Sequence, residues 1–194
     1  MGSIDSGEVQ ELYSACGLPR AWSPDGAILL YTDGPDLWSL AFPGGARRLL
    51  FKRQGYTVED VGFSPDGSWV AMVLAIEGKP KLQGVLSPFD HLSEENRWIT
   101  IIEEDYHLAL KWAAEGNIVY YLSRRDDFRC LYGQRLRNSD KRPIDLPIAI
   151  RHFHSYRNYP NAGSPIAVAL DKVMLRLTTR KSNVWAMDLR DAGR

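Results

Sequence analysis

A short turn sequence occurs twice in this chain, almost unchanged. WSPDG occupies residues 22–26, and FSPDG occupies residues 63–67. Two degenerate copies follow, WAAEG at 112–116 and VALDK at 168–172. The first residues of the four copies are 41, 49 and 56 positions apart. A period of about 40–50 residues is typical of β-propeller blades, so the repeat is the strongest constraint on the fold.

The residues of the turn predict a tight connection between antiparallel strands. Proline presets φ, aspartate hydrogen-bonds to nearby backbone, and glycine accepts a positive φ. Runs rich in Val, Ile, Leu, Tyr and Trp follow the turns, as strands prefer. These runs are AILLYT, SWVAMVL, NIVYYLS and VMLRLT, and after short polar gaps LWSLAF, KLQGVLS, CLYGQRL and VWAMDL. We expect Trp22 and Trp112 to pack between neighbouring units.

A further strand ends most units: ARRLLF at 46–51, RWITII at 97–102 and IDLPIAI at 144–150. Pro147 lacks the amide that a sheet ladder needs, so the third copy should lie at a sheet edge. The sequence therefore predicts an all-β protein, a β-propeller of about four four-stranded antiparallel blades. Their expected bounds are 15–51, 56–102, 106–150 and 164–189. A β-sandwich in which two turns are alike by chance is the less favoured alternative.

The N-terminal end of the chain has one outer strand too many, and the last unit has one too few. EVQELYS at 8–14 has the character of an outer strand without a blade of its own. The last unit ends after VWAMDL at 184–189, without an outer strand. Because proteins avoid exposed sheet edges, we expect the N-terminal strand to complete the fourth blade. A strand-exchanged dimer and an unclosed fragment of a larger propeller are the alternatives.

Composition disfavours several classes of function. Lysine and arginine number 24 and aspartate and glutamate 24, so the zero net charge does not favour a nucleic-acid partner. No apolar run approaches the roughly 20 residues of a membrane span. Two cysteines, Cys16 and Cys130, are too few for a disulfide framework and are expected to pack as free thiols. With no G-x-S-x-G, P-loop, G-x-G-x-x-G or CxxC motif, we expect neither an enzyme nor a cofactor.

One pair of histidines is a candidate for metal binding. His152 and His154 are two positions apart, so a strand would place them on one face. No third ligand is evident nearby in the sequence. We therefore expect a solvated or packed pair that contacts a ligand or partner, and no metal.

Two charged segments are candidates for partner contacts. IEEDYH at 102–107 places His107 beside three acidic residues in a loop entering an inner strand, where propeller channels bind ligands. SRRDDF at 123–128 places Arg124, Arg125 and Asp126 at a turn between strands. Local ion pairing or solvation explains both segments, and contact with an anion or peptide is the functional alternative.

Longer stretches resemble a known family. WSPDGAILLYTDGPDLWSLAF at 22–42 resembles the PD repeat of TolB-like six-bladed β-propellers. LKWAAEGNIVYYLSRRDDFRCLYGQRL at 110–136 is similar to segments of a set of bacterial propeller proteins, as are 16–26, 141–155 and 168–189. In that set such segments close longer proteins, often behind a kinase or DNA-binding regulatory domain. The resemblance implies a sensory or interaction module, extracytoplasmic or periplasmic if it holds for the full-length protein.

These observations favour a non-catalytic propeller that binds a protein or peptide, as a monomer or a strand-exchanged dimer. A small-ligand-binding or hydrolase-associated propeller domain of a larger enzyme is one alternative. A structural fragment of a larger propeller, without a site of its own, is the other.

Overall fold

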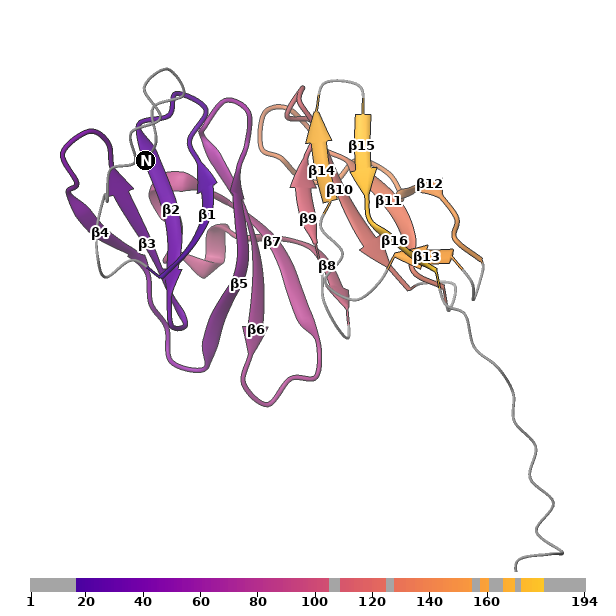
Figure 1. Cartoon of the computed structure of the whole chain (residues 1–194), viewed down its shortest axis with the longest axis horizontal. Coiled ribbons are helices and arrows are strands. Elements are labelled where there is room, and N and C mark those ends of the chain that lie inside the picture. The colour runs from indigo at the N-terminus through magenta and orange to yellow at the C-terminus, as the bar shows by residue number, and fades with distance from the viewer. Residues whose placement is uncertain are drawn as a thin grey trace, which may run out of the picture.

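In the computed structural model, three four-stranded antiparallel sheets follow one another along the chain (Figure 1). The structure describes residues 17–104, 109–124, 128–154, 158–160, 166–169 and 172–179. The first sheet contains β1 (Leu18–Trp22), β2 (Ile28–Asp33), β3 (Asp36–Ala41) and β4 (Arg47–Phe51). The second contains β5 (Tyr56–Phe63), β6 (Trp69–Ile76), β7 (Leu82–Pro88) and β8 (Ile99–Glu104). The third contains β9 (Leu110–Trp112), β10 (Ile118–Ser123), β11 (Cys130–Arg135) and β12 (Ile148–Arg151). Two short 3-10 helices, η1 (Phe89–His91) and η2 (Glu95–Arg97), lie between β7 and β8.

The last described strands form two small sheets. β13 (Asn158–Pro160) pairs with β16 (Leu177–Thr179), and β14 (Ile166–Ala169) pairs with β15 (Lys172–Leu175). The run VMLRLT, expected as one strand, is thus divided between β15 and β16. The first half of the run pairs with β14, from Leu175 opposite Ile166, and the second half pairs with β13.

The expected closing strands, at 8–14 and 184–189, lie outside the described residues. Closure of the ring, within one chain or by exchange between two, stays a prediction. Among the described strands, β12 lies at the edge of its sheet, as expected for the third outer strand, and it begins directly after Pro147.

The first strands of successive sheets lie against one another. β1 contacts β5, β5 contacts β9, and β9 contacts β14. Lys111 in β9 forms an ion pair with Asp60 in β5, with 2.7 Å between Nζ and Oδ2. Sheets that meet along their first strands are arranged as propeller blades are. In Figure 1, β1, β5, β9 and β14 follow one another across the middle of the molecule.

The core lies between the sheets, and β6 contributes to both sides of the second sheet. Because successive strand residues face opposite ways, Val70, Met72 and Leu74 join the cluster with the first sheet. Ala71 and Val73 join the cluster with the third sheet. Both faces of β6 are therefore covered, which explains why its sequence is apolar throughout rather than alternating.

The Ser-Pro-Asp-Gly turns are stabilised by their own side chains. Asp25 Oδ1 accepts hydrogen bonds from Ser23 Oγ at 2.5 Å and from the Ala27 amide at 3.0 Å, and Ser23 Oγ accepts one from the Ile28 amide at 2.8 Å. The second turn repeats this pattern with Ser64 and Asp66. The positive φ that the motif requires of its glycine is confirmed at Gly26, with 71°, and at Gly67, with 73°. Gly116, in the degenerate third turn, has the same conformation, with 69°.

The turns also lie against each other from sheet to sheet. A Cβ atom added at Gly67 would lie 3.5 Å from Cδ of Pro24, in the preceding turn. The equivalent position at Gly116 lies 3.4 Å from Cδ of Pro65. The proline of one turn therefore packs on the glycine of the next.

Gly67→Ala is expected to lower the free energy of unfolding by about 1–2 kcal/mol, because an L-residue is strained at this φ. The added methyl group would make only ordinary contact with Pro24, so the backbone supplies the cost. Gly62→Ala is the matched control, since Gly62 lacks a positive φ and has open space around its Cβ position. Urea denaturation should separate the two variants, and equal stability would contradict the alignment of the turns.

Trp112 and Trp22 differ in their surroundings. Trp112 is 8% exposed, and its Nε1 donates to the Gly62 carbonyl of β5 at 3.3 Å. Its expected packing between units is confirmed. The same expectation is wrong for Trp22, which is 43% exposed and contacts Phe42 edge-on. The reason is positional: Trp22 belongs to the first sheet, and no sheet precedes it among the described residues.

Candidate functional site

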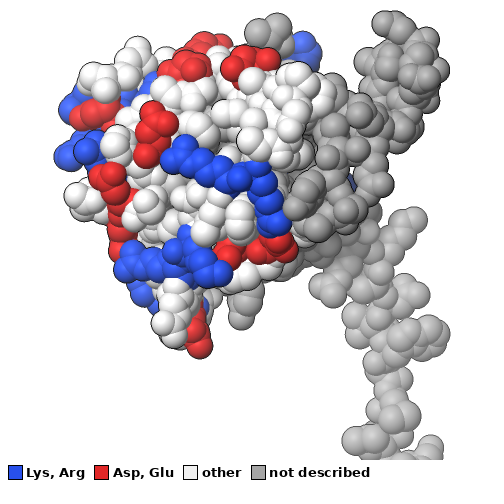
Figure 2. All heavy atoms as spheres, turned by 90° about the vertical axis from the view of Figure 1, so that its left-hand side faces the viewer, with Lys and Arg blue, Asp and Glu red and all other residues white. Residues whose placement is uncertain are grey.

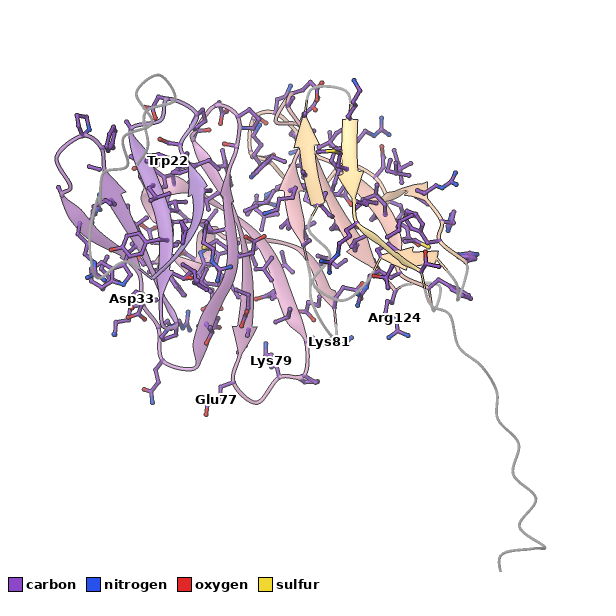
Figure 3. The ribbon with its side chains drawn as sticks, viewed as in Figure 1. Trp22, Asp33, Glu77, Lys79, Lys81 and Arg124 are labelled. Carbon is purple, nitrogen blue, oxygen red and sulfur yellow. The ribbon has the colours of Figure 1, made fainter. Side chains whose placement is uncertain are left out.

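Charged side chains gather at the end of the sheets opposite the Ser-Pro-Asp-Gly turns. This end, here called the hairpin face, carries the β2–β3, β6–β7 and β10–β11 connections. Figure 3 shows Trp22, at the start of the first turn, on the upper side of the molecule. Along the lower edge of the same view lie the exposed residues Asp33, Glu77, Lys79, Lys81 and Arg124. Because hairpins of consecutive sheets end at the same level, side chains distant in sequence share this face.

Glu104 connects the second and third sheets at the hairpin face. It is the last residue of β8, and its Oε1 accepts a hydrogen bond from Ser123 Oγ at 2.5 Å. Its Oε2 accepts one from the Arg124 backbone amide at 3.4 Å. These bonds hold the start of the β10–β11 turn, while the Arg124 side chain remains exposed.

A polar groove of 510 Å³ lies at this junction. It is lined by Lys81, Thr100, Ile101, Ile102, Glu103, Glu104 and Arg124. β8 pairs with β7 alone among the described strands, so the groove follows a sheet edge. The arrangement combines charged groups of both signs with one edge of an extended strand.

The two candidate histidines follow β12 at the same end of the third sheet. His152 Nδ1 and His154 Nε2 lie 3.2 Å apart, and both side chains are exposed. The ring of His154 lies 4.7 Å from that of Phe128, centroid to centroid. Cys130, at the start of β11, lies beneath them and is fully buried.

Cys130 is the residue that sequence reasoning did not connect with this pair. Its Sγ and one ring nitrogen from each histidine all lie within 4.8 Å of one another. Cys130 pairs with Ser123 of β10, and its neighbour Leu131 pairs with Arg151 of β12. The cluster forms because β11 and β12, which a long connection separates in the sequence, pair in this register. From the sequence, only a prediction that CLYGQRL pairs with the following outer strand could have revealed the cluster.

The structure brings together only some of the expected site residues. Arg124, His152 and His154 share the hairpin end of the third sheet. His107, Arg125 and Asp126 lie outside the described residues, so their expected roles stay predictions.

Among the described residues, the carboxylates with a shifted pKa lie in two turns and one loop. The hydrogen bond from Ser23, followed by that from the Ala27 amide, lowers the pKa of Asp25. At Asp66 burial opposes ionisation, but hydrogen bonds from Ser64 and Ser68 outweigh it and the pKa is lowered. The pKa of Glu94, in the β7–β8 connection, is lowered chiefly by its hydrogen bond with His91. The hydrogen bonds that chiefly lower these pKa values lie within the same turn or loop as the carboxylate.

The surface beside the first sheet mixes charges of both signs. Figure 2 shows Lys and Arg side chains next to Asp and Glu side chains across this side of the molecule. This distribution agrees with the zero net charge of the sequence. No helix in the described part of the chain is long and apolar enough to cross a membrane.

Comparison with solved structures identifies the fold. An oligogalacturonate lyase is 14% identical, with a TM-score of 0.57, over 92% of this chain and 52% of that chain. The β-propeller domain of the trilobed protease from Pyrococcus furiosus is 10% identical, with a TM-score of 0.51, over 98% of this chain and 62% of that chain. A protein described as TolB from Agrobacterium tumefaciens is 15% identical, with a TM-score of 0.39, over 84% of this chain and 76% of that chain.

The likenesses to the lyase and to the protease domain show the fold alone, and they confirm the expected propeller architecture. The chain spans about half to two thirds of the lyase and protease-domain structures, at 52% and 62%. No family model matches the sequence, and a search of curated proteins finds no match. The class of protein is therefore a β-propeller-like, all-β protein.

Proposed function

We propose that this chain is a non-catalytic propeller module that binds a peptide segment of a partner protein at the hairpin face. The observation that carries the proposal is the polar groove between the second and third sheets, bounded by Lys81, Glu103 and Arg124. Its floor follows β8, an edge strand among those described, and an extended peptide can add to such an edge through main-chain hydrogen bonds.

The two cationic side chains of the groove, Lys81 and Arg124, indicate one group that such a peptide carries. Arg124 is exposed, and its planar guanidinium matches a carboxylate in a bidentate fashion. Its own backbone amide donates to Glu104, which helps to fix where the side chain leaves the main chain. A peptide with an acidic side chain or a free C-terminal carboxylate meets these requirements. The exposed Lys79 and Lys81 on the neighbouring hairpin support the same preference.

We assign no catalytic pair of titratable groups to the proposed site. A catalytic pair is expected to have perturbed pKa values within a cavity. The carboxylates with shifted pKa values in the described residues are Asp25, Asp66 and Glu94, which serve turns and one loop.

Linear peptides selected from a displayed random library against the whole chain are expected to bind in the groove. Arg124→Glu should weaken their binding at least about tenfold, or about 1.4 kcal/mol, because it turns attraction for a carboxylate into repulsion. Arg142→Glu is the matched control: Arg142 is exposed in the β11–β12 connection, away from the groove. Fluorescence anisotropy with labelled peptides provides the dissociation constants.

Other results would favour the alternatives. Equal binding to both charge-reversal variants, or no enriched peptide, would contradict the proposed peptide site. Saturable binding of a small acidic ligand such as an oligosaccharide, lost in Arg124→Glu, would favour the small-ligand propeller instead. A chain without either activity would fit a structural segment of a larger protein.

A further inference from the structure

One cluster of metal-ligating groups lies beside the groove and is not needed for peptide binding. It consists of Cys130, His152 and His154. The thiol comes from the first residue of β11, and the imidazoles come from the segment that follows β12. We propose that these three residues bind a Zn²⁺ ion, with the fourth position open to water or to a side chain of a partner.

The separations of the ligand atoms are close to those of a zinc site. With Zn–N bonds of about 2.0–2.1 Å, two nitrogens of a tetrahedral site lie about 3.3 Å apart, and a sulfur and a nitrogen lie about 3.5 Å apart. His152 Nδ1 and His154 Nε2 are 3.2 Å apart. All three ligand atoms lie within 4.8 Å of one another, so side-chain movements of roughly 1 Å bring the sulfur to bonding distance.

One hydrogen bond to Cys130 suits the thiolate that a metal requires. The backbone amide of Phe153 donates to Cys130 Sγ at 3.3 Å. A donor directed at sulfur stabilises its charged form. Phe153 stands between the two histidines in sequence, so this bond also holds the His-Phe-His segment over the thiol. The sulfur is fully buried while both imidazoles are exposed, which leaves the ion a path from solvent.

Aromatic neighbours orient the imidazoles. The ring of Phe128 lies 4.7 Å from that of His154, with 33° between the planes. The ring of Tyr132 lies edge-on to His152, with centroids 6.5 Å apart. Fixed rings lose less freedom when a metal binds, and ligand orientation by neighbouring groups strengthens metal binding.

The choice of ion follows from the ligand types. One thiolate and two imidazoles form a mixed sulfur and nitrogen set, which suits Zn²⁺ rather than the oxygen-seeking Mg²⁺ or Ca²⁺. Three protein ligands with an open position are typical of zinc sites that retain a water molecule. Because the thiol must lose its proton, the affinity should rise with pH.

Metal titration of the reduced, metal-free whole chain tests the proposal. With a chromophoric chelator as competitor, one Zn²⁺ per chain is expected to bind. Cys130→Ser, His152→Gln and His154→Gln should each weaken binding at least about tenfold, as the loss of a ligand does. With Co²⁺ as the probe, a thiolate-to-metal charge-transfer band should be present and should disappear in Cys130→Ser.

Matched variants separate this site from adventitious binding. His91→Gln and Cys16→Ser alter the same residue types elsewhere, and each should retain one tight zinc and the cobalt band. Cys130 is buried and its variant could fold poorly, so the exposed histidine variants carry the test independently. Absence of the charge-transfer band in the wild-type chain, or equal zinc affinity in His154→Gln and wild type, would overturn the proposal.

Discussion

Trp112→Ala is expected to lower the free energy of unfolding by about 3–5 kcal/mol, the usual cost of deleting a large buried aromatic side chain. Trp112 belongs to the cluster between the second and third sheets. Its Nε1 also donates to the Gly62 carbonyl of the neighbouring sheet, so truncation leaves both a cavity and a carbonyl without this partner. Urea denaturation followed by circular dichroism measures the loss.

Two further variants identify the source of this effect. Trp112→Phe keeps most of the packing and removes the hydrogen bond, so we expect a loss of about 1–2 kcal/mol. Trp22→Ala removes the same side chain from a position that is 43% exposed, and its loss should be smaller than that of Trp112→Ala. Equal losses at Trp22 and Trp112 would contradict the packing of the sheets through β9.

Lys141→Ala is expected to lower the free energy of unfolding by about 2–3 kcal/mol, because a charged hydrogen bond is lost and a carbonyl loses its donor. Lys141 is 6% exposed, and its Nζ donates to the Gly116 carbonyl in the third turn at 2.8 Å. Its charge also contributes to the lowered pKa of Asp66 in the second turn. One lysine therefore interacts with the turns of two sheets.

The contribution of the charge can be separated from that of the aliphatic stem. Lys141→Met keeps most of the stem and removes the ammonium group, so it should retain part of the stability lost in Lys141→Ala. Lys52→Ala is a control, since its ion pair with Asp36 involves an exposed lysine and should be worth less than about 1 kcal/mol. Thermal unfolding of the four proteins, wild type included, should rank them in this way. A Lys141→Ala variant as stable as Lys52→Ala would contradict the assignment.

The turns could be predicted from the sequence because their stabilising interactions are local. Ser23, Asp25 and Gly26 lie within four residues, and the side chains themselves make the bonds that shape the turn. The β-rich runs were equally predictable, since apolar, β-branched and aromatic residues mark strands whatever their partners. Both kinds of signal lie within the span of a single hairpin.

The candidate site was only partly predictable because it depends on distant partners. Cys130 and His154 come together through the register of β10, β11 and β12, across a connection that contains no turn motif of the repeat. The exposure of Trp22 depends on which sheet precedes its own. The division of the VMLRLT run at Leu175 depends on the two different strands, β14 and β13, with which its halves pair. None of these properties is encoded near the residue concerned.

The packing of each turn proline on the next turn glycine makes the array of sheets directional. Pro24 and Pro65 each offer this contact to the sheet that follows. If the first or second unit were duplicated, the glycine of the copied turn would pack on the proline of the turn before it, as in the present structure. Ala114 occupies the proline position of the third turn, so a unit added after the third would meet a methyl group instead of a ring. The proline surface that receives the following glycine is therefore present on the first two turns and absent from the third.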